Sequence, residues 1–108
     1  MAISSEKDPL LLAVLARPER DLGAHAFVVT DEWEADLCAV GIASPANPRV
    51  LAYLSTWQQQ PDRYHLELEL PGEGECRTDY RVSGRWDSID YAELKERIAQ
   101  HLVLPNAR

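Results

Sequence analysis

The segment Arg63-Tyr64-His65-Leu66-Glu67-Leu68-Glu69-Leu70 decides the fold class of this chain. Apolar residues occupy every second position from Tyr64 to Leu70, and polar residues fill the positions between them. Because successive side chains of a strand point to opposite faces, this alternation predicts a half-buried antiparallel strand. A turn rich in Pro, Gly and Glu follows at 71–75, so the next run of residues is expected to pair with this strand.

The run over 76–83 also alternates, which predicts a hairpin with the segment 63–70. The residues expected on its buried face are Cys76, Thr78, Tyr80 and Val82. On the outer face, opposite charges are expected to pair across the two strands. The expected partners are Glu67 and Glu69 on the first strand and Arg77 and Arg81 on the second.

Further strands are expected before this hairpin. The residues at 27–30 are rich in β-branched and aromatic side chains, and a second run follows at about 33–42, so the two runs fit either two strands or one bent strand. A turn with two prolines at 44–48 leads into a strand over 49–57. The sheet is therefore a four- to five-stranded antiparallel meander. Trp57 and Trp86 stand at strand ends, where large aromatic side chains are expected to close the core.

Two helices are expected to pack on one face of this sheet. The first is a short helix from about Pro9 to Ala16 with Asp8 as its N-cap, and Pro18 is expected to end it. The second runs over about 88–102, where Ile and Leu recur at helical spacing. Its candidate N-caps are Asp87 and Asp90. The predicted fold class is thus a two-layer α+β domain.

The composition fits one domain, 1–108, ordered over roughly 8–104. The chain has 108 residues, of which 45% are hydrophobic, so a single core can form unaided. Lys and Arg number 11 against 18 Asp and Glu, which gives 11 − 18 = −7 and excludes a nucleic-acid-binding protein held by a general basic surface.

The cellular compartment is expected to be the cytoplasm. The apolar run 10–16 follows acidic residues instead of basic ones, unlike a signal peptide, and it is too short to span a membrane. Two cysteines, Cys38 and Cys76, make neither a disulfide framework nor a zinc-ligand set.

The sequence contains no recognisable catalytic or cofactor motif. Its three histidines, at 25, 65 and 101, have no metal-ligand spacing. No serine lies in a Gly-x-Ser-x-Gly turn, and the glycines at 72 and 74 alternate with glutamates that would repel phosphate. We therefore expect a non-enzymatic chain that binds no cofactor and no metal.

An acidic run around Trp33 is the strongest functional candidate. It consists of Asp31, Glu32, Glu34 and Asp36. One interpretation is a solvated edge strand whose charges prevent aggregation. The other is a docking surface, in which the carboxylates attract a basic partner protein and Trp33 anchors it. In that interpretation Glu73 and Glu75 lie at the rim of the same surface.

The order of these elements resembles the TriTu-type immunity proteins of bacterial polymorphic toxin systems. The resemblance covers roughly 34–102 and rests on the strand that ends in Trp57, Asn47-Pro48-Arg49-Val50-Leu51-Ala52-Tyr53-Leu54-Ser55-Thr56-Trp57, on the alternating strand after it, and on the closing helix. It implies a protein that binds a cognate toxin and blocks it, with no chemistry of its own.

Two other functions explain the same features. An acidic secretion chaperone would hold the segment of an effector protein on apolar grooves, and a housekeeping domain of unknown role is the third alternative. A toxin inhibitor should bind through carboxylates and lose affinity with salt, whereas a chaperone should be nearly insensitive to salt. Whether the chain is a monomer or a homodimer stays open.

Overall fold

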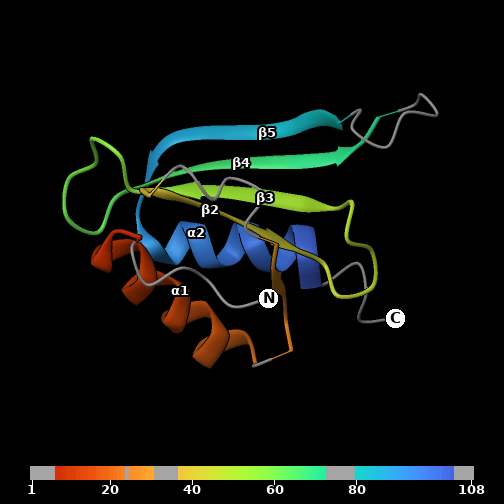
Figure 1. Cartoon of the computed structure of the whole chain (residues 1–108), viewed down its shortest axis with the longest axis horizontal. Coiled ribbons are helices and arrows are strands. Elements are labelled where there is room, and N and C mark those ends of the chain that lie inside the picture. The colour runs from red at the N-terminus through yellow and green to blue at the C-terminus, as the bar shows by residue number, and fades with distance from the viewer. Residues whose placement is uncertain (1–6, 24, 31–36, 73–79, 104–108) are drawn as a thin grey trace.

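The computed structural model describes residues 7–23, 25–30, 37–72 and 80–103. Its elements are α1 (Pro9–Leu22), β1 (Val28–Val29), β2 (Ala39–Ala43), β3 (Leu51–Ser55), β4 (Tyr64–Pro71), β5 (Tyr80–Ile89), α2 (Tyr91–Ile98) and the π-helical segment η1 (Ala99–Val103). The five strands form one antiparallel sheet in the order β1-β2-β3-β4-β5. Both helices lie on the same side of it (Figure 1). The predicted α+β fold is confirmed.

The core lies between the sheet and the two helices. On β4 the alternating residues Tyr64, Leu66 and Leu68 are buried, as their period of two predicts. They belong to one hydrophobic cluster with Leu94 of α2 and Leu11 of α1. Since burial of a large apolar side chain stabilises a fold by about 1.5–3 kcal/mol, this cluster is what holds the helices on the sheet.

Helix α1 is longer than predicted, and Pro18 lies inside it. A proline in a helix interior removes a hydrogen bond and costs roughly 3 kcal/mol. Here its ring is fully buried, and it continues the apolar face that Leu11, Val14 and Leu15 begin at helical spacing. Packing of this face offsets the cost, so the helix continues until Gly23, whose φ of 107° suits a helix end.

The predicted start of the second helix at 88 is also wrong, because β5 continues through Ile89. Ile89 pairs with Tyr64 and its side chain is buried in the core. The helix begins at Tyr91, and Asp90 is the N-cap, because its carboxylate accepts the backbone N–H of Glu93 at 2.9 Å. Packing of Ile89 thus decides where the strand stops.

The β4–β5 hairpin is confirmed, but its pairing differs from the alternation over 76–83. A register shift between Leu68 and Glu69 places Val82 opposite Glu69, so Val82 is 51% exposed instead of buried. Glu67 pairs with Arg85, at 2.6 Å, and not with Arg81. The residues at 76–79, with the predicted partner Arg77, lie outside the described residues.

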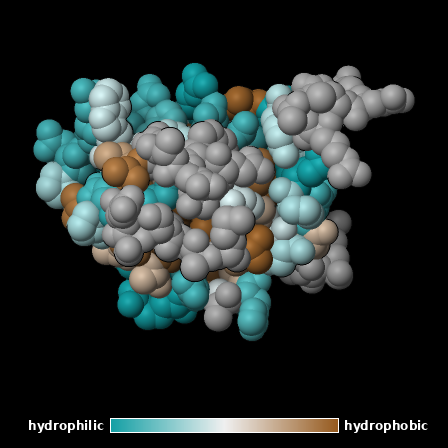
Figure 2. Space-filling model, in the orientation of Figure 1, coloured by the Kyte–Doolittle hydropathy of each residue, from teal (hydrophilic) through white to brown (hydrophobic). Residues whose placement is uncertain are grey.

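Polar side chains dominate the surface on the face drawn in Figure 2, and the hydrophobic ones form small, separate spots. The large apolar side chains that are exposed in the described residues are Leu10, Val28, Leu37, Trp57 and Val82. Single exposed apolar residues are common, so only a group of them at one place on the fold indicates a binding surface.

Candidate functional site

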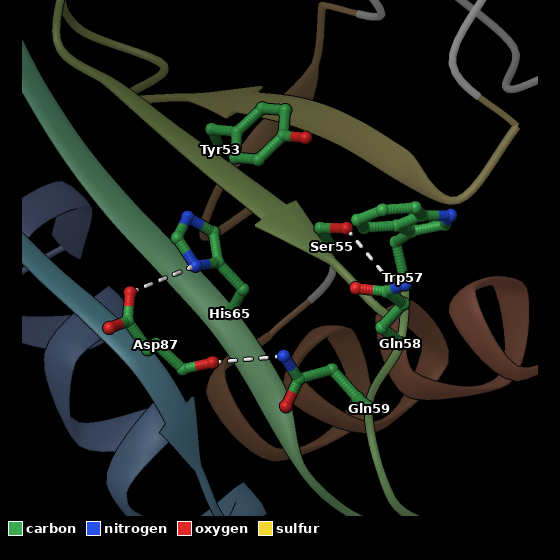
Figure 3. Close-up of a pocket in the computed structure, with 7 residues that line it drawn as sticks. All are labelled: Tyr53, Ser55, Trp57, Gln58, Gln59, His65 and Asp87. Atoms are coloured by element: carbon green, nitrogen blue, oxygen red, sulfur yellow. Dashed lines mark hydrogen bonds and ion pairs between the residues drawn. The ribbon is translucent and has the colours of Figure 1, made fainter.

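A pocket of about 530 Å³ lies on the sheet face that points away from the helices, where β3 ends and β4 begins (Figure 3). Because Leu54 and Leu66 point into the core, the alternating residues beside them point into this pocket. The lining residues are Tyr53, Ser55, Trp57, Gln58, Gln59, His65 and Asp87.

An irregularity in the sheet brings Asp87 into the pocket. The register of β4 and β5 shifts between Tyr64 and Leu66, as at a β-bulge, which commonly redirects a side chain. The Asp87 carboxylate lies 3.8 Å from Nδ1 of His65. On its other side, the imidazole meets the edge of the Tyr53 ring, with the ring centres 5.8 Å apart.

Ser55, His65 and Asp87 share this pocket without the alignment of a nucleophilic triad. In such a triad the imidazole hydrogen-bonds the serine hydroxyl. Ser55 lies opposite His65 across β3 and β4, but its hydroxyl accepts the backbone N–H of Trp57 at 3.1 Å. The side chain is also 4% exposed. The Ser55 hydroxyl is therefore hydrogen-bonded to the start of the loop and does not face the imidazole.

The loop between β3 and β4 consists of two tight turns with an unusual conformation. Gln58 and Asp62 have φ values of 56° and 59°, in the left-handed region that favours glycine. The first turn is closed by the N–H of Gln59 donating to the Thr56 carbonyl at 3.2 Å. In the second, the N–H of Arg63 donates to the carbonyl of Gln60 at 3.0 Å. Side chains with a Cβ are strained there, so the surrounding contacts must hold the loop.

Contacts with β5 and with α1 hold this loop against the rest of the fold. The Gln59 side-chain amide donates to the backbone carbonyl of Asp87 at 2.9 Å. Arg17 of α1 forms an ion pair with Asp62 at 3.1 Å. The loop is therefore tied to β5 on one side and to α1 on the other.

The first turn carries Trp57 out of the sheet, and its side chain is 62% exposed at the border of the pocket. The prediction that Trp57 closes the core is wrong, because β3 ends at Ser55 and the chain turns before the indole could reach the core. Trp86, in contrast, packs against the core cluster as predicted.

Hydrogen bonds tie three chain segments together at this end of the sheet. The backbone N–H of Asp8 donates to the Leu37 carbonyl at 2.7 Å, and the Thr56 hydroxyl donates to the Asp8 carboxylate at 2.7 Å. Each segment has an exposed large apolar side chain within two positions of its tie. These side chains are Leu10, Leu37 and Trp57. Three of the exposed apolar residues thus belong to one end of the molecule, where Trp57 lines the pocket and Leu10 lines a second hollow between α1 and the loop.

The predicted site residues lie outside the described residues: Asp31, Glu32, Trp33, Glu34, Asp36, Glu73 and Glu75. Leu37, which follows the acidic run, precedes β2 at the pocket end of the sheet, where β2 begins opposite the end of β3. Thr30, which precedes the run, donates its backbone N–H to the carbonyl of Gly41 in the middle of β2. Gly72 and Tyr80, which flank the second acidic segment, are at the opposite end. That both segments belong to one surface stays a prediction.

The negative charge of the chain is unevenly distributed. The described residues contain nine Lys and Arg and ten Asp and Glu, so they contribute 9 − 10 = −1. The remaining residues contribute 2 − 8 = −6 of the total of −7, and the run 31–36 alone contains four carboxylates. The acidic character that favours a basic partner is therefore concentrated in short segments attached to a nearly neutral scaffold.

Comparisons with protein-family models, with curated proteins and with solved structures give no match for this chain. Within the described ranges, no helix has the length and apolar character needed to cross a bilayer. No group of three His, Cys, Asp or Glu side chains in the described part of the chain is placed to hold a metal ion.

No pocket residue is selected as a site from the sequence, since Trp57 is expected in the core, His65 on the outer face of a strand, Asp87 as a candidate N-cap and the glutamines in a connection. The signal that was available is the composition of 57–60, where an aromatic residue and three glutamines follow a strand directly. A tryptophan in the core followed by an ordinary linker would have the same composition. The structure differs from that arrangement because two residues of the loop adopt left-handed conformations, which composition does not reveal.

Proposed function

We propose that this chain is a protein-binding domain with no chemistry of its own, and that it docks a basic partner at the pocket end of the sheet. The docking surface comprises the pocket with Trp57, the exposed side chains of Leu10 and Leu37 at the same end of the molecule, and the acidic run 31–36. By binding there, the domain covers the surface of the partner and blocks it.

The observation that carries this proposal is the exposure of Trp57 on a loop that is held in place. A large aromatic side chain loses stabilisation when it is left in water, and Trp is enriched among the residues that dominate binding energy. The adjoining Gln58 adds backbone strain, which persists only where the surrounding structure imposes it. A fixed, solvent-exposed indole beside a polar pocket is typical of a partner-binding site.

The charge distribution supports a basic partner. The run 31–36, with its four carboxylates, lies in the sequence between Thr30, which bonds the middle of β2, and Leu37, at the pocket end of the sheet. Clustered charge of one sign accelerates association with an oppositely charged partner, and salt screens the effect. Apolar anchors next to a carboxylate segment suit a partner that presents both basic and apolar side chains.

The finer proposal is that the partner is a toxin and that the chain is an immunity protein. It rests on the resemblance over 34–102 to TriTu-type immunity proteins and on the acidic composition. In this mechanism the carboxylates engage the basic substrate-binding surface of the toxin, and the bulk of the domain excludes the substrate.

A secretion chaperone is the second candidate, and the exposed apolar side chains at the pocket end favour it. Apolar grooves bind with little dependence on salt, whereas the acidic run should make binding salt-sensitive. Salt dependence therefore separates the two functions.

The test is to recover the partner from the native host with the immobilised chain and to titrate the purified partner at low and high salt. We expect Trp57→Ala to weaken binding about tenfold or more. The double charge reversal Glu32→Lys with Glu34→Lys should slow association about tenfold at low salt. Val82→Ala, an exposed apolar residue elsewhere, is the matched control and should bind as the wild type does.

Three outcomes decide between the functions. A salt-sensitive partner whose toxic activity is suppressed at equal molar ratio supports the immunity function. A secreted effector bound with little salt dependence supports the chaperone instead. Affinity and association rate unchanged by both Trp57→Ala and the charge reversal would refute the proposed docking surface.

A further inference from the structure

We infer that the pocket bounded by Tyr53, His65 and Trp57 receives an arginine side chain of the partner, with Asp87 as its counter-ion; this rests on the proposed function and names the chemistry of its docking site.

Three of the residues that line the pocket are aromatic. Figure 3 shows the rings of Tyr53 and His65 on one side of Ser55 and the Trp57 ring on the other, with Asp87 and Gln59 below them. The faces of Trp and Tyr rings attract cations, and Trp is the strongest of them. A guanidinium also stacks on an aromatic plane, which an ammonium group does not do. Aromatic walls of this kind favour a flat cation over an apolar ligand.

The charge at the border of the pocket is negative and available. The Asp87 side chain is 93% exposed, and its one ion contact in the described residues is with His65, at 3.8 Å. Two arginines on the strands beside Asp87, Arg85 of β5 and Arg63 just before β4, contact other residues. Arg85 pairs with Glu67 at 2.6 Å, and Arg63 donates from Nε to the Ser88 hydroxyl at 3.1 Å and from a terminal guanidinium nitrogen to the Ser88 carbonyl at 2.8 Å. An incoming cation therefore meets a carboxylate without displacing an existing Arg partner.

The hydrogen-bonding groups select arginine among cations. A guanidinium carries five N–H donors and accepts nothing, so it needs several acceptors arranged around a plane. The pocket supplies the Asp87 carboxylate and the side-chain carbonyl groups of Gln58 and Gln59, while the amide of Gln59 already donates to Asp87. An anionic ligand would face the carboxylate at close range. The volume of about 530 Å³ leaves room for one long side chain and the peptide backbone that carries it.

The experiment uses the full chain labelled with nitrogen-15 and two small probes. N-acetyl-arginine methylamide is the cation, and N-acetyl-citrulline methylamide is its neutral match in size and shape. The indole signal of Trp57 is assigned through Trp57→Phe. We expect the arginine probe to shift the Trp57 indole and the amides of Gln58 and His65 in a saturable way, with Kd in the millimolar range, and the citrulline probe to bind at least tenfold more weakly.

Two variants test the counter-ion. Asp87→Asn should weaken the arginine probe about fivefold or more. Glu96→Gln removes the same charge from an exposed position on α2 and should leave the affinity unchanged. Equal affinity for arginine and citrulline, or shifts that map away from the pocket, would refute the inference. An unchanged affinity in Asp87→Asn would refute the role of the carboxylate.

The experiments with the probes and with the partner can refute the arginine inference and the proposed function independently. If the recovered partner depends on Trp57 but neither probe binds, the docking surface stands and the arginine inference falls. If the arginine probe binds and the partner ignores Trp57, the pocket chemistry stands and the proposed function falls.

Discussion

The side-chain arrangements on the two faces of the sheet near β4 have different physical causes. On the helix side, Leu54 and Leu66 follow a strict alternation and meet the apolar faces of two helices. On the other side, the pocket depends on a register shift near His65 and on two residues in left-handed conformations. One face is set by hydrophobic periodicity, and the other by local backbone geometry. The predictions below test whether stability belongs to the first face and binding to the second.

The largest effect is expected on the helix side. Leu66→Ala removes a fully buried side chain at the centre of the cluster and should lower the free energy of unfolding by about 2–5 kcal/mol. The neighbouring substitution His65→Ala, on the pocket face, should change it by less than about 1 kcal/mol. Urea unfolding of both variants measures this. Equal costs would contradict the division between the two faces.

The next effect concerns Gly84, over which the Trp86 ring folds. A Cβ at position 84 would lie 2.6 Å from a carbon atom of that ring, so Gly84→Ala must displace the indole from the core edge. We expect a loss of about 1–3 kcal/mol, typical of overpacking. Ser83→Ala beside it is the control. A thermal melt in which Gly84→Ala matches the wild type would show that Trp86 moves at no cost.

A smaller, pH-dependent effect is expected where α1 meets α2. Burial, and then the Asp21 carboxylate that accepts its hydroxyl at 2.7 Å, raise the pKa of Tyr91 to about 12. The unfolded chain releases this proton near pH 10, so from about pH 10 to 12 it holds fewer protons than the native state, and stability falls as pH rises. Below pH 10 the contribution is fully present.

Tyr91→Phe removes this titration. The stability difference between wild type and variant should therefore shrink from about pH 10 upward, while both lose stability through other groups. Denaturant unfolding at about pH 8 and pH 11 measures the difference. A constant difference over that interval would contradict the raised pKa.

The smallest effect is expected in the loop. Gln58→Gly relieves a left-handed residue and should raise the free energy of unfolding by up to about 1 kcal/mol, although glycine also makes the unfolded chain more flexible. Gln60→Gly, in the same loop, has no such strain to relieve and should be neutral or destabilising. If Gln58→Gly loses as much stability as Gln60→Gly, position 58 is not strained.

The fold was largely readable from the sequence because periodicity carries it. The alternation over 63–70 gave the right strand and the right buried face, and Asp8 and Asp90 cap the helices as their side chains permit. The errors share one cause, namely that tertiary packing outweighs local signals. Burial of Pro18 keeps α1 helical, and pairing of Ile89 extends β5 past the expected helix start.

The candidate site was less readable. The exposure of Trp57 depends on a turn at Thr56–Gln59. The position of Asp87 depends on a register shift between β4 and β5, which no residue pattern in β5 predicts. The seven residues selected from charge, from Asp31 to Glu75, lie outside the described residues. Composition identified the acidic residues, but it could not identify the pocket.

Hydrogen exchange of the chain, alone and bound to the recovered partner, tests the docking surface most directly. The account predicts that binding slows exchange of the amides at 56–60 and at the start of β2, while α2 exchanges as in the free chain. Protection confined to α2, or a loop at 56–60 that exchanges equally fast in both states, would contradict it.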